Sequence, residues 1–440
     1  MIRSRPRALP HTALLVATLV VACAPQDSAS GSADAELEAR ARAIHDRVIT
    51  ADTHDDINPA NFTAERNYTM DLPTQVTLPR MEAGGLDVAW FVVYVGQGEL
   101  TPEGFDDAYT QAVTKFDAIH RLTEEIAPER IGLALTSDDV RRIVGEGRKV
   151  AMIGVENGYS IGTDVSRVRE FWERGARYMS LAHNGHSQLA DSNTGERDGE
   201  WLHGGLSELG RQVIAEMNRW GIVVDVSHPS REANLQSIAL SSAPVMASHS
   251  SARALNDHSR NLSDEELEAI AANGGVVQTV AFRSYVDQEK NAAHQEALRA
   301  LQEEVAAELG VELVDRRTLF QMSPDERDAY QAAFAPVQAA VEARIDEVNA
   351  VAPPVDVSDF VDHVDYLVRK MGIDHVGISS DFDGGGGVTG WNDASETFNV
   401  TLELVRRGYT EEEIAKLWSG NLLRVLDEAQ RVAAGIQAGG

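Results

Sequence analysis

The chain carries a His-x-Asp pair, His54 and Asp56, at the close of a short β-like stretch, Val48–Asp52. Side chains two residues apart on a strand point to the same side, so this imidazole and this carboxylate can act together. One nitrogen donor and one oxygen donor suit a borderline divalent metal such as zinc. His-x-Asp is a common tripeptide, however, and a structural hydrogen bond between the two side chains would explain the pair equally well.

Four later strand-like runs also end in a possible ligand: Glu156, His228, His249 and Asp381. Glu156 closes an apolar run that has no other reason to end in an acid, and one carboxylate can bridge two cations. An ion pair at a strand end is the simpler alternative for it. His228 and His249 occupy matching positions of consecutive runs and would be neighbours in a barrel. This recurrence favours metal ligands over isolated structural histidines.

Three further side chains could handle a proton or a substrate charge. Asp381 could accept a proton from water or hold a substrate ammonium, because a metal lowers the pKa of bound water towards neutrality; Asp383 is the competing choice. His183, after the fourth run, could donate to the oxyanion that forms when water attacks an amide. Arg260, after the sixth run, could clamp a carboxylate, and spacing cannot separate it from Arg253.

Eight short runs that are apolar on both faces alternate with helix-like stretches, as expected of parallel strands buried on both sides. The runs are residues 48–51, 87–95, 150–155, 178–182, 222–226, 244–247, 275–281 and 375–379. Eight β-then-α units predict an α/β fold, a (β/α)8 TIM-type barrel rather than an open doubly wound sheet. In a barrel, the candidate ligands at the ends of strands one, three, five, six and eight all converge on one face.

One segment departs from this alternation. Residues 287–350, between the seventh and eighth strands, are rich in Ala and Glu, and helices interrupted near Gly310 and Ser323-Pro324 fit them. A solvated helical insertion is favoured, since charged runs usually face solvent. A lid or a partner surface over the barrel mouth is the alternative.

The composition limits the kinds of partner that the protein can bind. The formal net charge of −30 argues against nucleic acid and anionic membrane surfaces, because phosphates would be repelled. We find no glycine-rich dinucleotide fingerprint after a strand and no phosphate-loop motif, so nucleotide cofactors are not expected. The hydrophobic fraction of 43% describes a globular chain with an ample core.

The N-terminus has the pattern of a secretory signal. Arg3, Arg5 and Arg7 precede an apolar run, residues 13–22, that is too short to span a bilayer as a helix. The run stops before Cys23, the only cysteine, and resembles a bacterial lipoprotein signal, in which the cysteine is lipidated and becomes the mature N-terminus. An ordinary signal peptide with an incidental cysteine is the alternative.

These features predict the organisation of the chain. We expect a signal peptide over 1–23, a flexible tether over 24–35, and a barrel domain over 36–440 that contains the insertion at about 287–350. The lipid on Cys23 would attach the protein to a membrane of a bacterial cell envelope, facing the periplasm. A single cysteine allows no intramolecular disulfide, so the core or a metal must hold the fold.

Several segments together resemble the membrane dipeptidase (renal dipeptidase-like) family of zinc peptidases, among the amidohydrolase-type barrels. The stretches that carry the resemblance are residues 52–56, 153–156, 180–184, 224–228, 247–253, 260–264, 380–384 and 420–425. The resemblance runs from about residue 40 to the C-terminal region. It implies a site with two zinc ions, the first held by His54, Asp56 and a bridging Glu156, the second by Glu156, His228 and His249.

The resemblance also implies roles for three other residues. His183 would polarise the scissile carbonyl or oxyanion, Arg260 would bind the terminal carboxylate of the substrate, and Asp381 would handle the proton or the amino group. The family hydrolyses dipeptides, often with a D-residue at the C-terminal position, and some members open β-lactams. A homodimer is among the assemblies that we allow for.

The sequence departs from the family pattern at two places near the barrel mouth. Glu156 is followed by Asn157-Gly158-Tyr159, where small residues and often a histidine are expected. The tyrosine that often follows strand seven has no clear equivalent, since Phe282, Arg283 and Tyr285 are all candidates. Both departures bear on side-chain preference and leave hydrolysis as the expected reaction.

Two other functions remain as alternatives. The same metals could serve another amide hydrolase that acts on N-acyl amino acids or β-lactams. The chain could instead be a lipoprotein that captures peptides without cleaving them. Capture needs neither a proton acceptor such as Asp381 nor an oxyanion donor such as His183, so the enzyme is favoured.

Overall fold

The computed structural model describes Met1 and residues 27–315, 318–319 and 322–439. The predicted signal peptide and Cys23 lie outside the described residues. None of the helices in the described part is both long and apolar enough to cross a membrane. We expected a flexible tether over 24–35, but the structure has helix α1 over Asp27–His45. The Ala- and Glu-rich sequence that follows Ala33 favours a helix, and the helix extends back through the Ser and Gly residues.

Eight parallel strands form a barrel in the order β1-β2-β4-β5-β6-β7-β8-β9. They are β1 (Ala51–Asp56), β2 (Val88–Tyr94), β4 (Lys149–Glu156), β5 (Ala176–Ser180), β6 (Val223–Asp225), β7 (Met246–Ser250), β8 (Val276–Val280) and β9 (Val376–Ser379). The backbone N–H of Asp56 donates to the carbonyl of Phe382, just after β9, at 2.9 Å, which brings the last strand against the first. The predicted (β/α)8 barrel is confirmed.

Strand β1 differs from its predicted position. The prediction was residues 48–51, but the strand runs over Ala51–Asp56, so His54 and Asp56 lie inside it. Its polar residues are buried because they bond within the barrel: Asp52 accepts the backbone N–H of Ser380 at 2.9 Å. An apolar pattern cannot identify a strand of this kind. The short strand β3 (Ile131–Leu133), which pairs with β4 outside the barrel order, was also missed.

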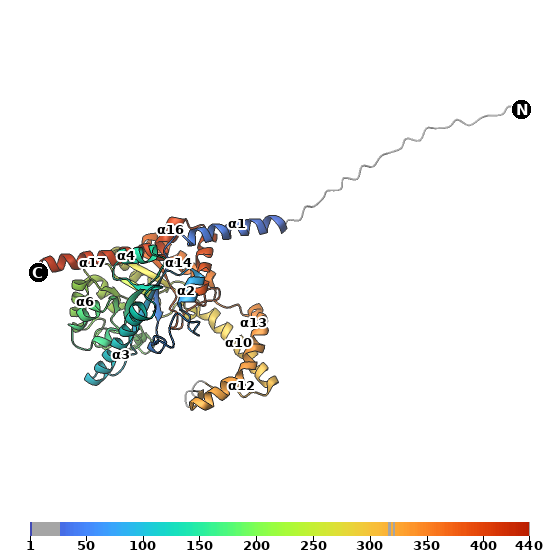
Figure 1. The fold of residues 1–440 in the computed structure, drawn as a ribbon, viewed down its shortest axis with the longest axis horizontal. Helices are drawn as coiled ribbons and strands as arrows, with labels where there is room; N and C mark the ends of the chain where they lie inside the picture. The colour runs from blue at the N-terminus through green and yellow to red at the C-terminus, as the bar shows by residue number, and fades with distance from the viewer. Residues whose placement is uncertain (2–26, 316–317, 320–321, 440) are drawn as a thin grey trace.

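The helices cover the outside of the barrel (Figure 1). They are α2 (Leu78–Gly84), α3 (Pro102–Arg121), α4 (Ser137–Gly145), α5 (Arg167–Glu173), α6 (Glu208–Trp220), α7 (Arg231–Leu240), α8 (Asp264–Asn273), α9 (Arg283–Val286), α14 (Val357–Met371), α15 (Phe398–Arg406), α16 (Glu411–Ala415) and α17 (Asn421–Gly439). Helix α8 shows how the sequence sets such boundaries. Ser263 and Glu266 form a capping box at its start, and Gly274 ends it in the left-handed conformation at φ 83°.

The barrel interior below the mouth is packed with aromatic rings. Trp90 of β2 stacks on Tyr178 of β5, with ring centroids 5.2 Å apart. Tyr178 fits there because its neighbour across the strand pair is Gly154, where a Cβ would collide with the tyrosine ring. The phenol of Tyr178 therefore stands inside the barrel and points at the strand that carries His54.

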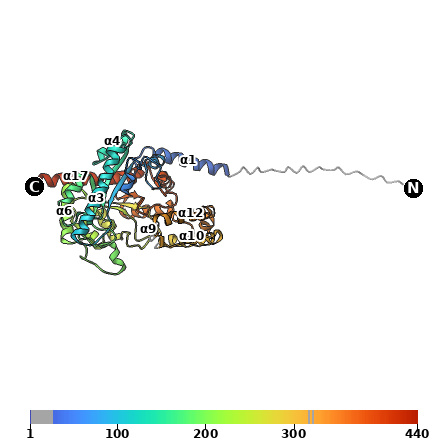
Figure 2. The ribbon, with the colours of Figure 1, turned by 60° about the horizontal axis from the view of Figure 1, so that its bottom comes forward.

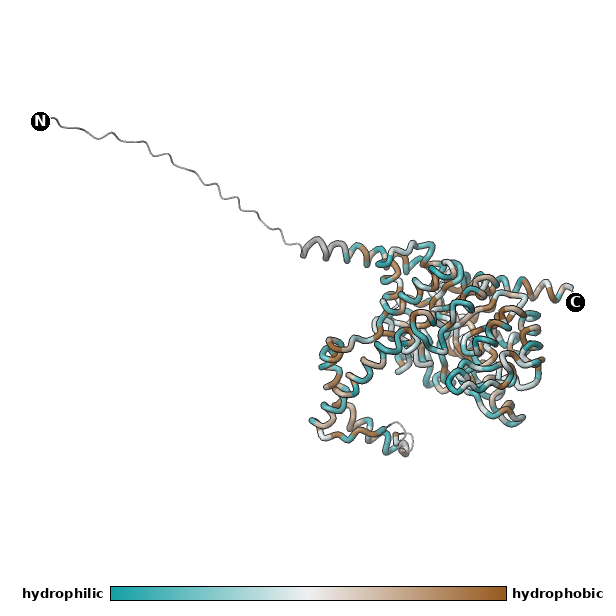
Figure 3. The backbone as a smooth tube through the Cα atoms, turned by 180° about the vertical axis from the view of Figure 1, so that it is seen from behind, coloured by the Kyte–Doolittle hydropathy of each residue, from teal (hydrophilic) through white to brown (hydrophobic). Residues whose placement is uncertain are grey.

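The predicted insertion between the seventh and eighth barrel strands is a helical arm of α10 (Gln288–Leu309), α12 (Pro324–Ala343) and α13 (Ile345–Val351). It has an apolar cluster of its own, which includes Leu301, Val337 and Val348. Figures 1 and 2 show the arm projecting away from the barrel, and Figure 3 shows hydrophobic and hydrophilic residues alternating along it. None of the described residues that line the barrel mouth comes from these helices, which supports the solvated insertion over the lid.

Candidate metal centre and active site

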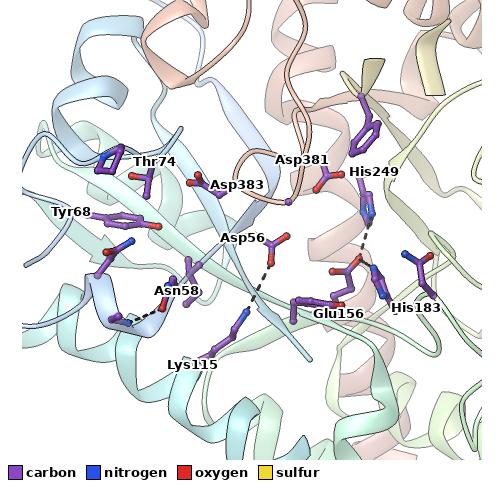
Figure 4. Close-up of a pocket in the computed structure, with 18 of the residues that line it drawn as sticks. Asp56, Asn58, Tyr68, Thr74, Lys115, Glu156, His183, His249, Asp381 and Asp383 are labelled. Carbon is purple, nitrogen blue, oxygen red and sulfur yellow. Dashed lines mark hydrogen bonds and ion pairs between the residues drawn. The ribbon is translucent and has the colours of Figure 1, made fainter. Parts of the chain in front are cut away.

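A cavity of about 760 Å³ opens at the C-terminal ends of the barrel strands. Six of the predicted site residues line it, and Figure 4 shows five of them around its floor: Asp56, Glu156, His183, His249 and Asp381, with His228 as the sixth. His54 lies beneath them, 1% exposed. The residues come from strands far apart in the sequence, and the closed barrel brings them together as predicted.

Four non-glycine residues of the described chain have a positive φ, and all four follow strands at this end of the barrel. They are Asn157 (74°), His228 (79°), Asp381 (60°) and Asp383 (61°). Such backbone angles are costly for residues with a side chain and concentrate at functional sites. Asparagine tolerates this conformation better than most residues, which accounts for Asn157 after Glu156. Its side-chain amide also donates to the carbonyl of Val95 at 3.0 Å.

Glu156, the last residue of β4, lies at the centre of the cluster. Its Oε1 atom is 3.0 Å from Nε2 of His228 and 3.5 Å from Nε2 of His249. Its Oε2 atom is 3.5 Å from Nε2 of His54. Each carboxylate oxygen thus faces a different set of imidazoles, which is the arrangement that a bridging carboxylate requires.

Possible metal-ligand atoms of seven residues gather in three overlapping groups, with all atoms of a group within 4.8 Å of one another. The groups are His54, Glu156 and His249; Glu156, His183 and His228; and His54, Asp56 and Asp381. All five predicted ligands therefore belong to one continuous cluster. Asp381 and His183 lie within the same cluster, so each is as close to ligand atoms as the ligands are to one another.

The hydrogen-bond partners of His54 determine which of its nitrogens is free. Tyr178 uses its only proton to donate to the carbonyl of Thr53 at 3.0 Å. The contact of 3.1 Å between the Tyr178 oxygen and Nδ1 of His54 must then be donated by the imidazole. Nε2 of His54 is left with a lone pair, is buried, and has no hydrogen-bond partner among the described residues. A divalent cation fits that nitrogen.

A parallel arrangement orients His249. The hydroxyl of Ser248 donates to Asp225 at 2.7 Å, so its contact of 2.8 Å with Nδ1 of His249 is donated by the imidazole. Nε2 of His249 then carries the lone pair, and it lies 3.0 Å from Nε2 of His228 and 3.5 Å from Oε1 of Glu156. Outer partners of this kind set the tautomer of metal-binding histidines. Asp225 thus fixes the orientation of His249 through Ser248.

The pKa shifts of the cluster residues favour a bound cation. Burial raises the pKa of Asp381 well above its usual range, and nearby Asp56 and Glu156 raise it further. Burial would also raise the pKa of Glu156, but attraction to a protonated His54, whose own pKa these carboxylates raise to about 9 against burial, holds it well below its usual value; a bound cation would take the place of that proton. Three buried carboxylates that repel one another in one cavity are stabilised by bound divalent metal. Burial lowers the pKa of His249 and keeps this imidazole neutral, as a metal ligand must be.

The loop after β9 is shaped around two acids. A Cβ on Gly384 would collide with the carboxylates of Asp381 and Asp56, so only glycine allows them to lie close together there. Asp383, the competing choice for the catalytic acid, accepts the backbone N–H groups of Gln75 at 2.9 Å and Val76 at 3.3 Å. Its carboxylate is occupied in holding the loop, whereas Asp381 faces the ligands.

The structure separates the two candidate arginines, although neither lines the main cavity. Arg260 is 4% exposed and donates to the carbonyl of His249 at 3.1 Å. Its guanidinium lies 5.4 Å from the ring of Tyr285, which does line the cavity. Arg253 is instead held by Glu196 at 2.8 Å and by Asp257 at 2.7 Å.

The aromatic candidates after the seventh barrel strand are also separated. Phe282 and Tyr285 both line the cavity and stack on each other, with centroids 4.1 Å apart. Arg283 is turned away and donates to Asn392 at 3.0 Å.

Sequence reasoning missed two charged residues of the cavity wall, Arg66 and, on α3, Lys115. The Nζ atom of Lys115 lies 4.0 Å from Oδ1 of Asp56. The helix-like stretch predicted after the second run was given no bounds, so no direction was expected for the Lys115 side chain. A signal was nevertheless present, because Lys115 follows Ala108 and Ala112 at helical spacing and so falls on the buried face of the segment.

The fold and the site define a class of protein, a metal-dependent hydrolase built on a (β/α)8 barrel. The profile of one family, described as membrane dipeptidase (peptidase family M19), matches residues 38–439. The chain therefore belongs to the membrane dipeptidase family, as the sequence resemblance predicted, and is a metallo-dipeptidase.

Related proteins and structures agree with this assignment. Dipeptidase tcpJ of Claviceps purpurea is 29% identical over 371 residues, which are 83% of this chain and 72% of that protein. Dipeptidase aclJ of Aspergillus oryzae is 30% identical over 380 residues, 85% of this chain and 74% of that one. The crystal structure of the probable dipeptidase PvdM from Pseudomonas aeruginosa has a TM-score of 0.72 at 32% identity, covering 91% of this chain and all of that one. A metallopeptidase from Rhodobacter sphaeroides, bound to a phosphinate mimic of L-Ala-D-Ala, shares the fold with a TM-score of 0.64 at 21% identity, covering 87% of this chain and 99% of that one.

Proposed function

We propose that this protein is a dinuclear zinc dipeptidase. The observation that carries the proposal is the position of Glu156, whose Oε2 lies near Nε2 of His54 and whose Oε1 lies near Nε2 of His228 and of His249. The first ion would be held by His54, Asp56 and Glu156, and the second by Glu156, His228 and His249. Histidine nitrogens and carboxylate oxygens in this proportion suit zinc.

Asp381 is the proposed proton carrier. When bound, zinc supplies a Lewis acid that lowers the pKa of water towards neutrality. Asp381 would accept the proton of the attacking water and pass it to the amino group that leaves the cleaved peptide bond. Its position on the loop after β9, beside Asp56, also allows its carboxylate to hold the free amino group of the dipeptide.

His183 is the proposed donor to the carbonyl oxygen. Burial lowers its pKa, so the imidazole is neutral at pH 7 and offers one N–H. Its ring is held between Tyr94, at 4.7 Å, and His228, at 4.1 Å, which limits its rotation. A fixed donor of this kind stabilises the negative charge that develops on the carbonyl oxygen.

Arg260 is the proposed partner of the substrate's terminal carboxylate. It donates to the carbonyl of His249 at 3.1 Å, and its guanidinium lies 5.4 Å from the ring of Tyr285. Asp381 would then bind the amino end of a dipeptide, and Arg260 would bind its carboxyl end. The phosphinate mimic of L-Ala-D-Ala on the Rhodobacter sphaeroides relative supports a substrate whose second residue is D.

A substrate panel tests this function. Zinc-loaded protein should hydrolyse L,L- or L,D-dipeptides, measured by release of the free amino acids. Turnover of N-acyl amino acids or a β-lactam without turnover of any dipeptide would replace the proposal with the other amide hydrolase. Tight dipeptide binding without cleavage of any compound would favour the peptide-capture lipoprotein.

We also propose that Cys23 carries a lipid that anchors the protein to a bacterial membrane, facing the periplasm. The support is the sequence pattern alone, a basic N-terminus and an apolar run that stops at the only cysteine. Cys23→Ala should move the protein from the membrane fraction to the soluble fraction, whereas continued membrane association would contradict the anchor. The homodimer that we allow for would appear as a doubled mass in sedimentation.

A further inference from the structure

The cavity wall opposite the histidines carries a half-buried ammonium group. Lys115 of α3 has a side chain that is 15% exposed and lines the cavity, and its Nζ atom lies 5.3 Å from the centre of the Tyr94 ring. In Figure 4, Lys115, Asn58, Tyr68 and Thr74 lie on one side of Asp56, and His183 and His249 lie on the other.

The protons of this ammonium are not used within the described chain. The nearest carboxylate oxygen is Oδ1 of Asp56, at 4.0 Å, which is an ion pair but too long for a hydrogen bond. Asp56 is also occupied as a member of the metal cluster. Three N–H donors therefore remain for whatever fills the cavity, and a half-desolvated ammonium gains strongly from an anionic partner.

A second cation lines the same side of the cavity. Arg66 donates from Nε to Asn61 at 2.6 Å and forms no ion pair with a carboxylate in the part of the chain that the structure describes. The acid on this side, Asp383, is already bonded to two backbone N–H groups. In a chain with a net charge of −30, this wall therefore presents positive charge whose N–H donors are not all used.

We propose that Lys115, assisted by Arg66, binds the side-chain carboxylate of an acidic first residue, so that the enzyme prefers dipeptides that begin with Glu or Asp. The inference rests on the proposed function, in which Asp381 holds the amino group and Arg260 the terminal carboxylate. Lys115 and Asp381 both lie next to Asp56, and Arg260 lies on the far side, next to His249. The side chain nearest to Lys115 is therefore that of the first residue.

The test compares Glu-Ala with Gln-Ala, which differ by one charge and have the same shape. The wild-type kcat/KM should be about tenfold higher for Glu-Ala, as expected of one charged hydrogen bond. In Lys115→Met the ratio should fall close to one, mainly through KM, and in Lys115→Arg it should be largely retained. Lys149→Met is the matched control, because Lys149 is 16% exposed and pairs with Asp87 outside the cavity; it should keep the wild-type ratio.

A measurement on the wild type alone tests the preference for an acidic first residue, even if a variant fails to fold. Salt screens a charge pair, so raising the ionic strength should lower the ratio of Glu-Ala to Gln-Ala. A ratio near one in the wild type, or a ratio that persists in Lys115→Met, would overturn the inference. A preference for Ala-Glu over Ala-Gln alone would also overturn it, since the acid would then be read at the second residue. Turnover of Ala-Ala with no acidic preference would leave the proposed function intact, whereas no turnover of any dipeptide would remove both.

Discussion

The hydroxyl oxygen of Tyr178 lies 3.1 Å from Nδ1 of His54, and this contact decides which nitrogen of the imidazole faces the cavity. Because the phenol gives its own proton to the carbonyl of Thr53, it can only accept from the histidine. The contact depends on Gly154, which leaves room for the tyrosine ring inside the barrel. A residue outside the lining of the cavity thus fixes the tautomer of His54.

Tyr178→Phe should weaken metal binding. Without the phenol oxygen, His54 has no acceptor for its Nδ1 proton and is free to adopt the other tautomer, so the affinity of the ion that it holds should fall by about 10- to 100-fold. Competition with a chelator of known affinity measures the change. Tyr159→Phe is the matched control, because that buried phenol bonds to the carbonyl of Glu99, away from the metal cluster. Equal zinc affinity in the two variants would contradict the orienting role.

Asp381→Asn should abolish hydrolysis while zinc remains bound. The amide has nearly the same shape but cannot accept the proton of the attacking water, so kcat should fall by about a hundredfold or more. Metal analysis of the purified variant tests whether the ions are retained. Asp383→Asn serves as the comparison, since its carboxylate holds backbone N–H groups and its loss should reduce stability more than kcat. Full activity in Asp381→Asn would remove the proposed role.

Removal of metal should both inactivate and destabilise the protein. Asp56, Glu156 and Asp381 are then left as mutually repelling buried carboxylates. A ligand present at a thousandfold excess over its Kd stabilises the folded state by about 4 kcal/mol. The protein treated with a chelator should therefore melt several degrees lower than the zinc-loaded protein. Added zinc should restore both the activity and the melting temperature. Fewer than about two zinc equivalents per chain would contradict the dinuclear assignment, and an unchanged melting temperature would contradict the charge argument.

Stability should fall below pH 7 in part through His363 of α14. Its Nδ1 accepts the backbone N–H of Ala252 at 3.1 Å, and its Nε2 donates to the carbonyl of Val286 at 2.9 Å, so only the neutral ring satisfies both. Burial lowers its pKa. The unfolded chain therefore takes up a proton near the ordinary pKa of about 6.5 while the folded chain does not, and the unfolding free energy decreases as pH falls through that value.

His363→Gln should remove this contribution. A glutamine offers one acceptor and one donor but does not titrate, so the variant should lose less unfolding free energy between pH 7 and pH 5 than the wild type does. The difference should be about 1.4 kcal/mol for each unit by which folding shifts the histidine pKa. Denaturant unfolding at the two pH values, with zinc held constant, measures it. Equal losses in both proteins would show that His363 does not contribute.

Local patterns in the sequence were sufficient for the barrel and for the membership of the metal cluster. Short runs that are apolar on both faces identify buried parallel strands, and His228, His249 and Glu156 follow such runs at matching positions. The same reasoning placed β1 too early, because its residues are polar and are buried by bonds to other strands, such as the bond from Ser380 to Asp52.

The sequence by itself determined which residue types meet at the barrel mouth, because strand order and side-chain alternation are local properties. Only the tertiary structure decided how they are oriented. Tyr178 is 124 residues from His54, and the choice between Arg260 and Arg253 depends on which carboxylates each meets across the fold. The approach of Lys115 to Asp56 joins a helix to a strand in the same way. Such contacts form between segments that chain spacing does not relate, so packing alone sets them.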